Sequence, residues 1–419
     1  MAKLRYLDLF AGAGGLSEGF IRAGFIPVSH VEMDTAACYT LKTRLAYRWL
    51  QKHGKGQIYD SYLNGEITRD EFYSKVPASV LDTVLNYEIS WQNIDEIFEK
   101  VDKNLKGKKI DLIVGGPPCQ AYSLIGRARD ENGMLGDKRN YLYILYGEFL
   151  KRYKPKYFVF ENVLGLLSAK DTDEHLHFDK MRNLFRECGY KTEYRKLNAA
   201  DYGVLQNRKR IILIGKYGEN QDFYPEIPQE ERRYLVEEIL RDLPSLQAGQ
   251  GQIRPVETMD YQGTYLYESG IKQVNRQMVT FHCARTNTDQ DKEIYRIAVT
   301  LWNTEHKRLS YVDLPEHLRT QKNMDSFLDR FKVVASDAEC SQTVVAHVAK
   351  DGHYFIHPDI LQNRSLTPRE LARLQTFPDD FYFESMSGKA SRTPAFKQIG
   401  NAVPVCLAEK VARALKNIW

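Results

Sequence analysis

Cys119 follows four residues with special backbone preferences, in the run Gly115-Gly-Pro-Pro-Cys119. Such a run holds a cysteine on a rigid loop, whereas most free cysteines pack into a hydrophobic core. A thiolate is intrinsically nucleophilic and needs only modest activation. The run therefore predicts a positioned cysteine nucleophile.

Other reactive groups follow or precede predicted strands. Glu161 ends the strand Tyr157–Phe160, and Arg208 and Arg210 stand just before the strand that continues to Gly215. Taken alone, this basic run is equally typical of a solvated turn. In open α/β sheets, however, the chemistry lies just beyond the carboxyl ends of the strands, which is where Cys119 and Glu161 fall.

A glycine-rich turn opens the chain, in Asp8-Leu-Phe-Ala-Gly-Ala-Gly-Gly15. Glycines let backbone N–H groups at a helix N-terminus approach a ligand closely, although a plain tight turn has the same composition. The spacing is not GxGxxG, which argues against an ordinary dinucleotide site. Glu32, at the end of the next strand, is placed to accept hydrogen bonds from both ribose hydroxyls.

Hydrophobic patterning predicts the elements that position these groups. Buried strands are expected at 3–10, 26–31, 110–114, 157–160 and 210–215, with a helix at 16–23. This order is typical of a parallel, doubly wound α/β sheet. The polar, mostly helical stretch 35–109 is interpreted as an insertion, and the chain after 215 as a second, irregular domain. A helix at 365–375, opened by Thr367-Pro368, a glycine-containing loop at 396–405 and a helix at 405–418 are expected to close the chain.

Composition sets broad limits. The chain has 419 residues, 43% of them hydrophobic, and a formal net charge of +4, which is too weak to indicate nucleic acid by itself. The six cysteines are scattered and form no CxxC pair, so neither a disulfide framework nor a zinc site is expected. His347, His353 and His357 lack partnering ligands, so no metal is predicted. No run of about 18 apolar residues and no signal peptide is visible, which favours the cytoplasm.

Several motifs stand in the order found in one family. The chain resembles DNA cytosine-C5 methyltransferases of the bacterial restriction-modification type, over about residues 1–34, 110–215 and 364–419. The matching motifs are Asp-Leu-Phe-x-Gly-x-Gly-Gly15, Pro-Pro-Cys119-Gln, Asp137-Lys-Arg-Asn-Tyr-Leu142, Glu161-Asn-Val, Gln206-x-Arg-x-Arg210, Arg364-Ser-Leu-Thr-Pro-Arg-Glu370 and Gln398-Ile-Gly-Asn-Ala-Val-Pro404.

The resemblance implies a fold and a reaction. It implies an S-adenosylmethionine-dependent, Rossmann-like catalytic domain (1–215 and 364–419) and a smaller target-recognition domain (216–363). Cys119 would attack C6 of a flipped-out cytosine in a specific duplex sequence, and C5 would then accept the methyl group. Glu161, in its protonated or hydrogen-bonding form, would hold N3 and the exocyclic amine. Arg208 and Arg210 would steady O2 or the Cys119 loop. The base that removes the C5 proton is not identified.

The resemblance also implies contacts. Two departures concern adenine, because Met33 replaces a frequent tryptophan and Asn93 stands where the family has an aspartate. The implied cofactor residues are Asp8, Phe10, Ala11, Gly12, Gly14, Gly15, Glu32, Met33, Asn93, Ile94, Pro118, Leu142, Asn401, Ala402 and Val403. The implied DNA contacts are Gln120, Ser123, Arg127, Arg139, Asn162, Val163 and Gln206, with Arg254, Arg276, Arg285 and Arg308 as base-reading types in the recognition domain.

Three alternatives remain. One branch of the same fold acts on tRNA, although the long polar middle region favours sequence-specific DNA. A catalytically silent DNA-binding regulator would keep the fold, but the intact Cys119, Glu161 and Arg210 argue against it. An unrelated cysteine hydrolase would need a histidine base at a strand end, and neither His175 nor His177 fits that place. A monomer acting beside a cognate restriction endonuclease is expected from the family.

Overall fold

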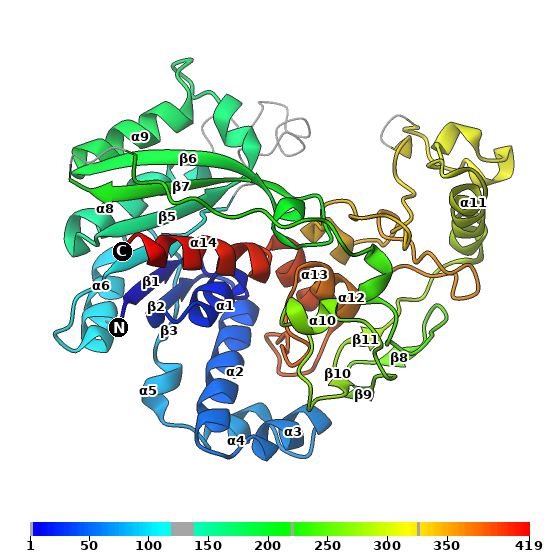
Figure 1. Cartoon of the computed structure of the whole chain (residues 1–419), viewed down its shortest axis with the longest axis horizontal. Coiled ribbons are helices and arrows are strands. Elements are labelled where there is room, and N and C mark those ends of the chain that lie inside the picture. Colours follow the sequence, from blue (N-terminus) through cyan, green and yellow to red (C-terminus); the bar gives the residue numbers. More distant parts are fainter. Residues whose placement is uncertain (1–2, 119–137, 219–221, 325–326) are drawn as a thin grey trace.

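The computed structural model describes residues 3–118, 138–218, 222–324 and 327–419. A seven-stranded sheet in the order β3-β2-β1-β4-β5-β7-β6 forms its centre (Figure 1). The first five strands in this order are parallel, and β7 runs antiparallel to β5 and β6. The strand bounds are β1 (Arg5–Leu9), β2 (Ile26–Glu32), β3 (Val84–Asn86), β4 (Leu112–Gly115), β5 (Tyr157–Asn162), β6 (Tyr190–Asn198) and β7 (Lys209–Tyr217).

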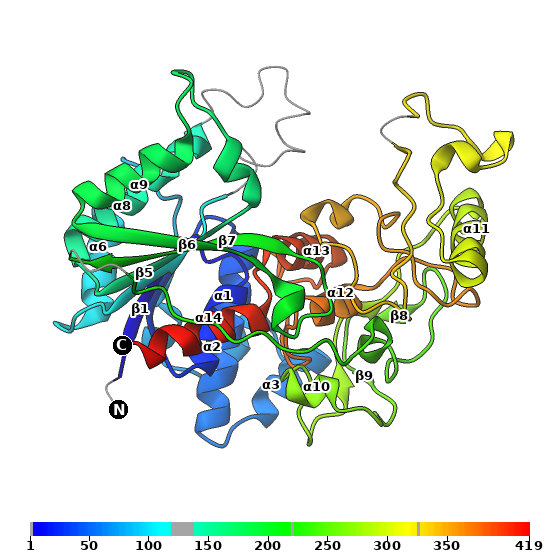
Figure 2. The same cartoon turned by 45° about the horizontal axis from the view of Figure 1, so that its top comes forward.

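Helices cover both faces of the sheet, because side chains alternate between the faces along each strand. Leu9 and Phe160 point into a core shared with α6, α8 and α9. Tyr6 and Val114 point into the opposite core, with α1 and α14 (Figure 2). This arrangement confirms the predicted Rossmann-like fold. The bounds are α1 (Gly15–Arg22), α2 (Thr35–Lys52), α6 (Ile94–Leu105), α8 (Leu142–Tyr153), α9 (His177–Glu187) and α14 (Val405–Asn417).

Two strands of the sheet were not predicted. β3 has three residues and lies inside the stretch interpreted as an insertion, yet it pairs with β2. β6 lies at the opposite edge and carries lysine, glutamate and arginine side chains, so its pattern lacks the apolar alternation that marks a strand. Charged residues suit an edge strand because they discourage pairing with another chain.

The middle of the presumed insertion packs away from the sheet. Helices α3 (Gln57–Asn64), α4 (Arg69–Tyr73) and α5 (Ala78–Leu81) follow α2. The hydroxyl of Tyr59 donates to the Asp380 carbonyl at 2.8 Å, and the hydroxyl of Tyr62 donates to the Glu384 carboxylate at 2.7 Å. These helices therefore buttress a segment more than 300 residues later in the chain.

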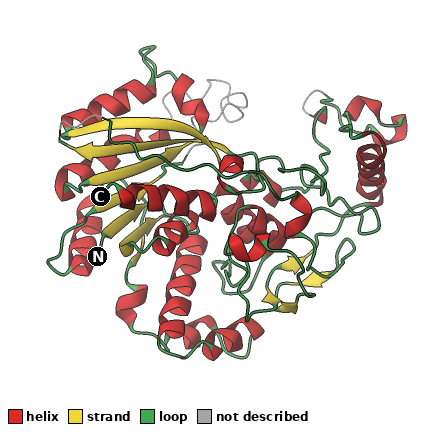
Figure 3. Cartoon of the chain, in the orientation of Figure 1, coloured by secondary structure: helices red, strands yellow, loops and turns green. Residues whose placement is uncertain are grey.

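Between β7 and α12 (Pro368–Leu374) the described regular elements are short apart from α11, as Figure 3 shows. A small lobe around α11 has its own core, including Tyr295 and Phe331, and stands apart from the sheet (Figure 1). The bounds here are β8 (Gly251–Gln252), β9 (Val256–Glu257), β10 (Met278–Val279), β11 (His282–Cys283), α10 (Tyr265–Glu268) and α11 (Asp289–Glu305). The 3-10 helices of the described chain are η1 (Lys138–Tyr141), η2 (Leu164–Ser168), η3 (Ala199–Tyr202), η4 (Val236–Ile239), η5 (Tyr311–Asp313), η6 (Glu316–Leu318) and η8 (Ala346–Ala349).

The chain returns to the sheet at its C-terminus. Helix α12 (Pro368–Leu374) confirms the predicted helix, with a capping box between Thr367 and Glu370. The glycine-containing loop expected at 396–405 is wrong over its first half, because α13 (Arg392–Asn401) is helical. Gly400 is not a loop marker: a Cβ there would lie 2.3 Å from the Ala346 nitrogen, so glycine serves a close helix contact.

Three further observations apply to the described residues alone. None of their helices is both long and apolar enough to cross a bilayer. Their five cysteines form no disulfide. Their His, Cys, Asp and Glu side chains form no group of three or more that could hold a metal ion.

Candidate active site

The glycine-rich turn after β1 adopts the backbone that its composition predicts. Phe10, Gly12 and Gly14 have φ angles of 57°, 55° and 85°. The Gly14 N–H donates to the Ala11 carbonyl at 3.0 Å and closes the turn before α1. A Cβ on Gly12 would meet no described atom within 4 Å. The backbone at Gly12 therefore borders open space, where a ligand can approach it.

Glu32 lies against this turn. Its carboxylate accepts the Gly12 N–H at 2.7 Å and the Asp34 N–H at 2.7 Å, one on each oxygen. Burial raises the pKa of Glu32, and these two hydrogen bonds oppose the rise. Each carboxylate oxygen can accept a second hydrogen bond, so this partly exposed side chain can still receive a diol.

Asp8 lies beneath the same turn and is 1% exposed. Neither of its carboxylate oxygens has a hydrogen-bond partner among the described residues. Burial raises the pKa of Asp8 well above its usual range, and the neighbouring Glu32 raises it further. A buried carboxyl without a donor is costly, and such groups cluster at functional sites.

The turn at 401–403, near the C-terminus, packs against the glycine-rich turn after β1. A Cβ on Gly15 would lie 2.4 Å from the Val403 carbonyl oxygen, so the two segments touch through glycine. Asn401 is exposed, whereas Ala402 and Val403 are buried. The Lys397 ammonium also lies 2.6 Å from the Asp34 carboxylate and ties α13 to the segment after Glu32. The sequence gives no signal for that ion pair, because its partners are 363 residues apart.

The segments that follow β2 and β3 are tied together. The Tyr87 N–H donates to the Glu32 carbonyl at 3.0 Å, and the Asn86 amide donates to the Met33 carbonyl at 3.1 Å. Met33 is 59% exposed. Asn93 precedes α6 and donates to the Glu88 carbonyl at 3.2 Å. Met33 and Asn93, the two residues expected to border adenine with a departure from the family, thus lie on two segments that are joined by hydrogen bonds.

The remaining expected cofactor residues are mostly apolar. Phe10 and Leu142 are partly buried and pack against the same hydrophobic core. Ile94 is buried at the start of α6, and Ala11 is 8% exposed beside α2. Pro118 is partly exposed and is the last described residue before Cys119.

Glu161 and Arg210 form the second half of the site. The Arg210 Nε lies 2.8 Å from the Glu161 carboxylate, and both side chains are largely buried. A Cβ on Gly116 would lie 2.7 Å from the other carboxylate oxygen, so the loop toward Cys119 runs directly past Glu161. Cys119 itself lies outside the described residues, as do Gln120, Ser123 and Arg127. For Arg139 the structure describes its place in η1 but not its side chain.

Two residues expected to contact DNA have buried side chains in this structure. Gln206 is 0% exposed, and its amide donates to the Leu374 carbonyl at 2.9 Å. Asn162 is 1% exposed, and its amide donates to the Pro117 carbonyl at 3.3 Å. Both side chains are buried and hold neighbouring backbone segments through these hydrogen bonds. Val163, by contrast, is partly exposed.

Arg208 does not join the carboxylate pair. It is 1% exposed, and its guanidinium donates to the carbonyls of Val344 at 2.6 Å and Gly400 at 3.3 Å. These contacts do not favour the expected contact of Arg208 with O2 of the base, and the alternative expectation, that Arg208 steadies the Cys119 loop, falls on residues outside the described ones. Arg210 is the arginine that lies beside Glu161.

The expected base-reading arginines differ in availability. Arg276 is 2.8 Å from Asp60 of α3, and Arg285 donates to the Val348 carbonyl at 2.6 Å. These two are engaged within the protein, so their assignment as base readers is not supported. Arg254 and Arg308 are exposed.

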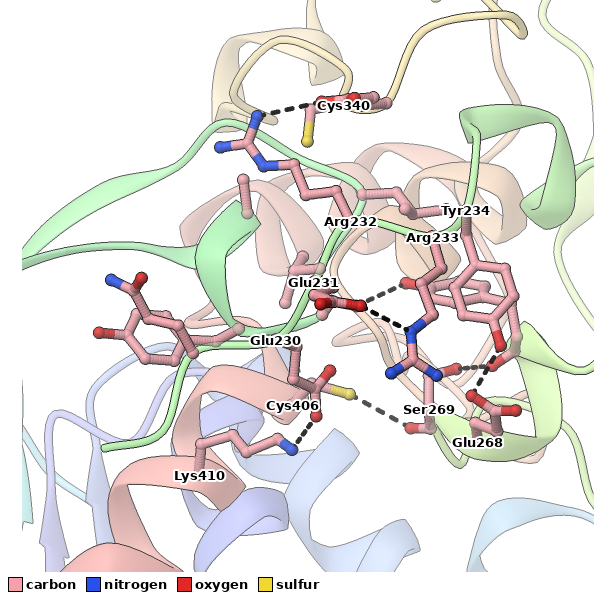
Figure 4. Close-up of a pocket in the computed structure, with 18 of the residues that line it drawn as sticks. Glu230, Glu231, Arg232, Arg233, Tyr234, Glu268, Ser269, Cys340, Cys406 and Lys410 are labelled. Carbon is pink, nitrogen blue, oxygen red and sulfur yellow. Dashed lines mark hydrogen bonds and ion pairs between the residues drawn. The ribbon is translucent and has the colours of Figure 1, made fainter. Parts of the chain in front are cut away.

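A cavity of about 430 Å³ lies elsewhere, beside α14 and η3. Figure 4 shows ion pairs across it, including Lys410 with Glu230 and Arg233 with Glu231. None of the predicted site residues lines this cavity. Its charges pair with one another, unlike the unpartnered Asp8.

Comparisons with known proteins agree with this geometry. Residues 4–68 and 82–417 match the family described as C-5 cytosine-specific DNA methylase. A type II methyltransferase of Bacillus paralicheniformis is 37% identical over 98% of both chains. One of Desulfomicrobium norvegicum is 30% identical over 98% of this chain and 88% of the relative.

Solved structures share the fold. One is described as a DNA modification methyltransferase encoded within an E. coli prophage, with a TM-score of 0.61 and 22% identity over 99% of both chains. A methyltransferase of Entamoeba histolytica has a TM-score of 0.53 and 14% identity over 100% of this chain and 99% of its own.

Proposed function

We propose a covalent route for this chain, which belongs to the C-5 cytosine-specific DNA methylase family and is a DNA cytosine-C5 methyltransferase. In this route Cys119 attacks C6 of a cytosine that has left the duplex. One observation carries the proposal: the largely buried Glu161–Arg210 pair lies against Gly116, on the loop that leads to Cys119.

The cofactor is S-adenosylmethionine, which supplies a methyl group on a positively charged sulfur. The residues around the glycine turn fit it. Glu32 can accept the ribose hydroxyls, open space above Gly12 admits the ligand to the backbone, and Asp8 offers an unpartnered acceptor. Phe10, Met33, Asn93 and Ile94 would border adenine, and Pro118, Leu142 and the turn 401–403 would complete the pocket.

The chemistry begins at the ring. Cytosine C5 is a poor nucleophile while the ring is aromatic. A bond from the Cys119 sulfur to C6 makes C5 electron-rich, and C5 then takes the methyl group. Glu161, in its protonated form, donates to N3 as negative charge develops on the ring, and its other oxygen accepts from the exocyclic amine. Arg210 holds Glu161 in place. Loss of the C5 proton to a base then breaks the C6–S bond and frees Cys119.

A cytosine inside a duplex cannot reach a thiolate, so the base must rotate out, as in other enzymes that modify bases. The region 216–363 would recognise the DNA sequence around it, while 1–215 and 364–419 form the catalytic domain. Arg254 and Arg308 remain candidates for DNA contacts there. The enzyme would protect host DNA from a restriction endonuclease that cuts the same site.

The covalent route is tested by Cys119→Ser. We expect methylation to fall to background while binding of DNA and S-adenosylhomocysteine persists, because serine is far less nucleophilic at neutral pH. Methylation-sensitive sequencing of duplex DNA gives product and target together, and a tRNA sample tests the alternative substrate. Cys188→Ser is the control, because Cys188 ends α9, next to the start of β6 and distant in the chain from the predicted site residues. Full activity in Cys119→Ser would overturn the route.

A second experiment traps the bond. DNA containing 5-fluorocytosine should form an adduct with Cys119 in the presence of the cofactor, because fluorine cannot leave as a proton does. Peptide mass spectrometry locates the adduct. Its absence from wild-type protein that methylates ordinary DNA would argue against attack at C6.

A further inference from the structure

Residues 205–208, which precede β7, lie alongside residues 341–344. The Ser341 N–H donates to the Leu205 carbonyl at 3.0 Å, and the Asn207 N–H donates to the Ser341 carbonyl at 2.9 Å. Between these bonds, the Gln206 amide oxygen accepts the Val344 N–H at 2.9 Å. The two segments are therefore held together by backbone and side-chain hydrogen bonds.

Arg208 extends this contact to a third segment. One end of its buried guanidinium binds the Val344 carbonyl and the other binds the Gly400 carbonyl. Gly400 in turn touches the backbone of 345–346, where a Cβ would lie 2.3 Å from the Ala346 nitrogen and 2.4 Å from the Val345 carbonyl carbon. We call residues 205–208, 341–346 and 400 the joint.

The joint lies where three functions meet. Arg208 is two residues before Arg210, which pairs with Glu161. Gly400 immediately precedes the turn 401–403, which packs against Gly15 beside the cofactor residues. The segment 341–346 belongs to the region proposed to recognise DNA. A shift at the joint would therefore move the recognition region relative to both halves of the active site.

We propose that Gln206 and Arg208 are positioning residues that hold the recognition region in register with Glu161 and with the cofactor turn. Neither touches the flipped cytosine. The proposal rests on the proposed recognition role of 216–363. A misplacement of about 1 Å can cost roughly 100-fold in rate, so a loosened joint weakens the link between a correct DNA sequence and a correctly placed base.

Arginine is required at 208 for a physical reason. Its planar guanidinium presents donors in a rigid fork, and here the fork spans two carbonyls on different segments. A lysine ammonium is a point donor and cannot reproduce this bridge. Arg208→Lys therefore keeps the charge and removes the bridge.

The test measures sequence discrimination. Arg208→Lys, Gly400→Ala and Thr343→Val each disturb the joint differently: the first removes the bridge, the second inserts a Cβ against 345–346, and the third removes a hydroxyl that donates to the Asn207 carbonyl. Arg232→Gln is the control, because Arg232 also bridges to this part of the chain, to Asp201 and Glu339, but from an exposed position. Each full-length protein methylates a library of random duplexes, and sequencing gives the ratio of target to near-target methylation.

We expect the ratio to fall about 10-fold in Arg208→Lys and Gly400→Ala, with about 100-fold or less lost in rate on the target, and about twofold in Thr343→Val. Arg232→Gln should match wild type. If Arg208 instead touched the base, Arg208→Lys would lose rate equally on every sequence, Gly400→Ala would keep the wild-type ratio, and the proposal would be overturned. Thr343→Val removes one surface hydroxyl and should fold. If Arg208→Lys or Gly400→Ala does not fold, an unchanged ratio of target to near-target methylation in Thr343→Val would also overturn the proposal. Failure of the recognition role itself would appear separately, as a wild-type enzyme without sequence preference.

Discussion

The two halves of the proposed active site, the cofactor half around the glycine turn and the target half around Glu161, differ in the partners of their carboxyl groups. Around the glycine turn, Asp8 has no partner among the described residues and Glu32 is held by two backbone N–H groups, with no cation against either. Across the sheet, Glu161 has the Arg210 guanidinium at 2.8 Å. The pKa values of Asp8 and Glu32 are raised chiefly by burial.

The difference teaches what each half must do. A carboxyl group held by an arginine is already fixed in position, which suits a group that must donate a proton or hydrogen bond to N3 as negative charge develops on the ring. A carboxyl without a cation keeps acceptor capacity for a ligand that brings its own hydroxyl donors and positive charge. Under the proposed function, the target half is organised before binding, and the cofactor half is completed by its ligand.

The largest expected effect comes from the paired carboxylate. Glu161→Gln should lower kcat by about 100- to 1000-fold, because an amide cannot protonate N3 and forms no ion pair with Arg210. S-adenosylhomocysteine affinity, measured by calorimetry, should stay within about twofold, since Glu161 belongs to the other half. Glu148→Gln, which removes an exposed partner of Lys151 on α8, is the control. A loss of cofactor affinity as large as the loss of kcat would show that Glu161 also serves cofactor binding and would contradict the division into two halves.

Glu32→Gln tests the cofactor half and should have the next largest effect. Cofactor affinity should fall about 10-fold or more, because an amide accepts poorly from a diol. Single-turnover kcat at saturating cofactor should change little. The exposed Glu231 gives the control variant Glu231→Gln. A kcat loss as large as that of Glu161→Gln would contradict the division of roles.

The pH dependence of cofactor binding follows from the same residue. The carboxylate form accepts the hydroxyls, and the pKa of Glu32 is raised by burial. Wild-type affinity should therefore fall as the pH is lowered, starting above the pH of about 4.3 at which an ordinary glutamate protonates. Glu32→Gln should flatten this dependence over the same range. A dependence that survives unchanged in the variant would assign the titration to another group.

The sequence predicted the cofactor half more fully than the target half. Asp8, the glycines and Glu32 lie within one strand–turn–helix–strand unit, so local rules are enough to place them. Glu161 and Arg210 were also predicted, because each borders a strand. The roles of Gln206 and Arg208 were not, since their partners Val344 and Gly400 are more than 130 residues away.

The misread elements have related causes. Gly400 looked like a loop residue, although its missing Cβ serves contact with Ala346 across the fold. β6 escaped notice because an edge strand carries charged side chains. The presumed insertion hid β3, whose three residues are too few to show a period. In each case a tertiary neighbour decides what the local pattern leaves open.

Asp8→Asn should have a smaller effect than the variants above, and it should stabilise the folded protein at neutral pH. In the folded chain the pKa of Asp8 is raised by burial, while the unfolded chain titrates near 3.9. As the pH rises above about 4, the unfolded state loses its proton first, so the folded state loses relative stability up to the folded pKa. Asparagine removes this loss and should raise Tm at pH 7 by about 2 to 4 °C.

Differential scanning calorimetry at pH 5 and pH 7, without cofactor, measures this change, and cofactor affinity should drop in the same variant. Asp82→Asn, on an exposed residue at the end of α5, is the control. A lower Tm for Asp8→Asn at pH 7 would show that the folded protein stabilises the Asp8 charge, and the contrast with Glu161 would fail.

Met33→Trp should have the smallest effect, and the effect should be a gain in cofactor affinity. Met33 is 59% exposed beside the end of β2, at the position where related enzymes often carry tryptophan. An aromatic pair contributes about 0.5 to 1.5 kcal/mol beyond the area it buries, which corresponds to about 2- to 10-fold tighter cofactor binding. Discrimination between DNA sequences should not change, since Met33 takes part in none of the hydrogen bonds that hold the joint together.

Met386→Trp controls for a new exposed tryptophan, because Met386 is 69% exposed and lies at the α4 contact, away from both half-sites. Fluorescence of the new indole should respond to cofactor in Met33→Trp and not in Met386→Trp. If cofactor affinity is unchanged and the fluorescence of the new tryptophan does not respond to cofactor, adenine does not lie beside Met33. The adenine would then bind beside the end of a different strand.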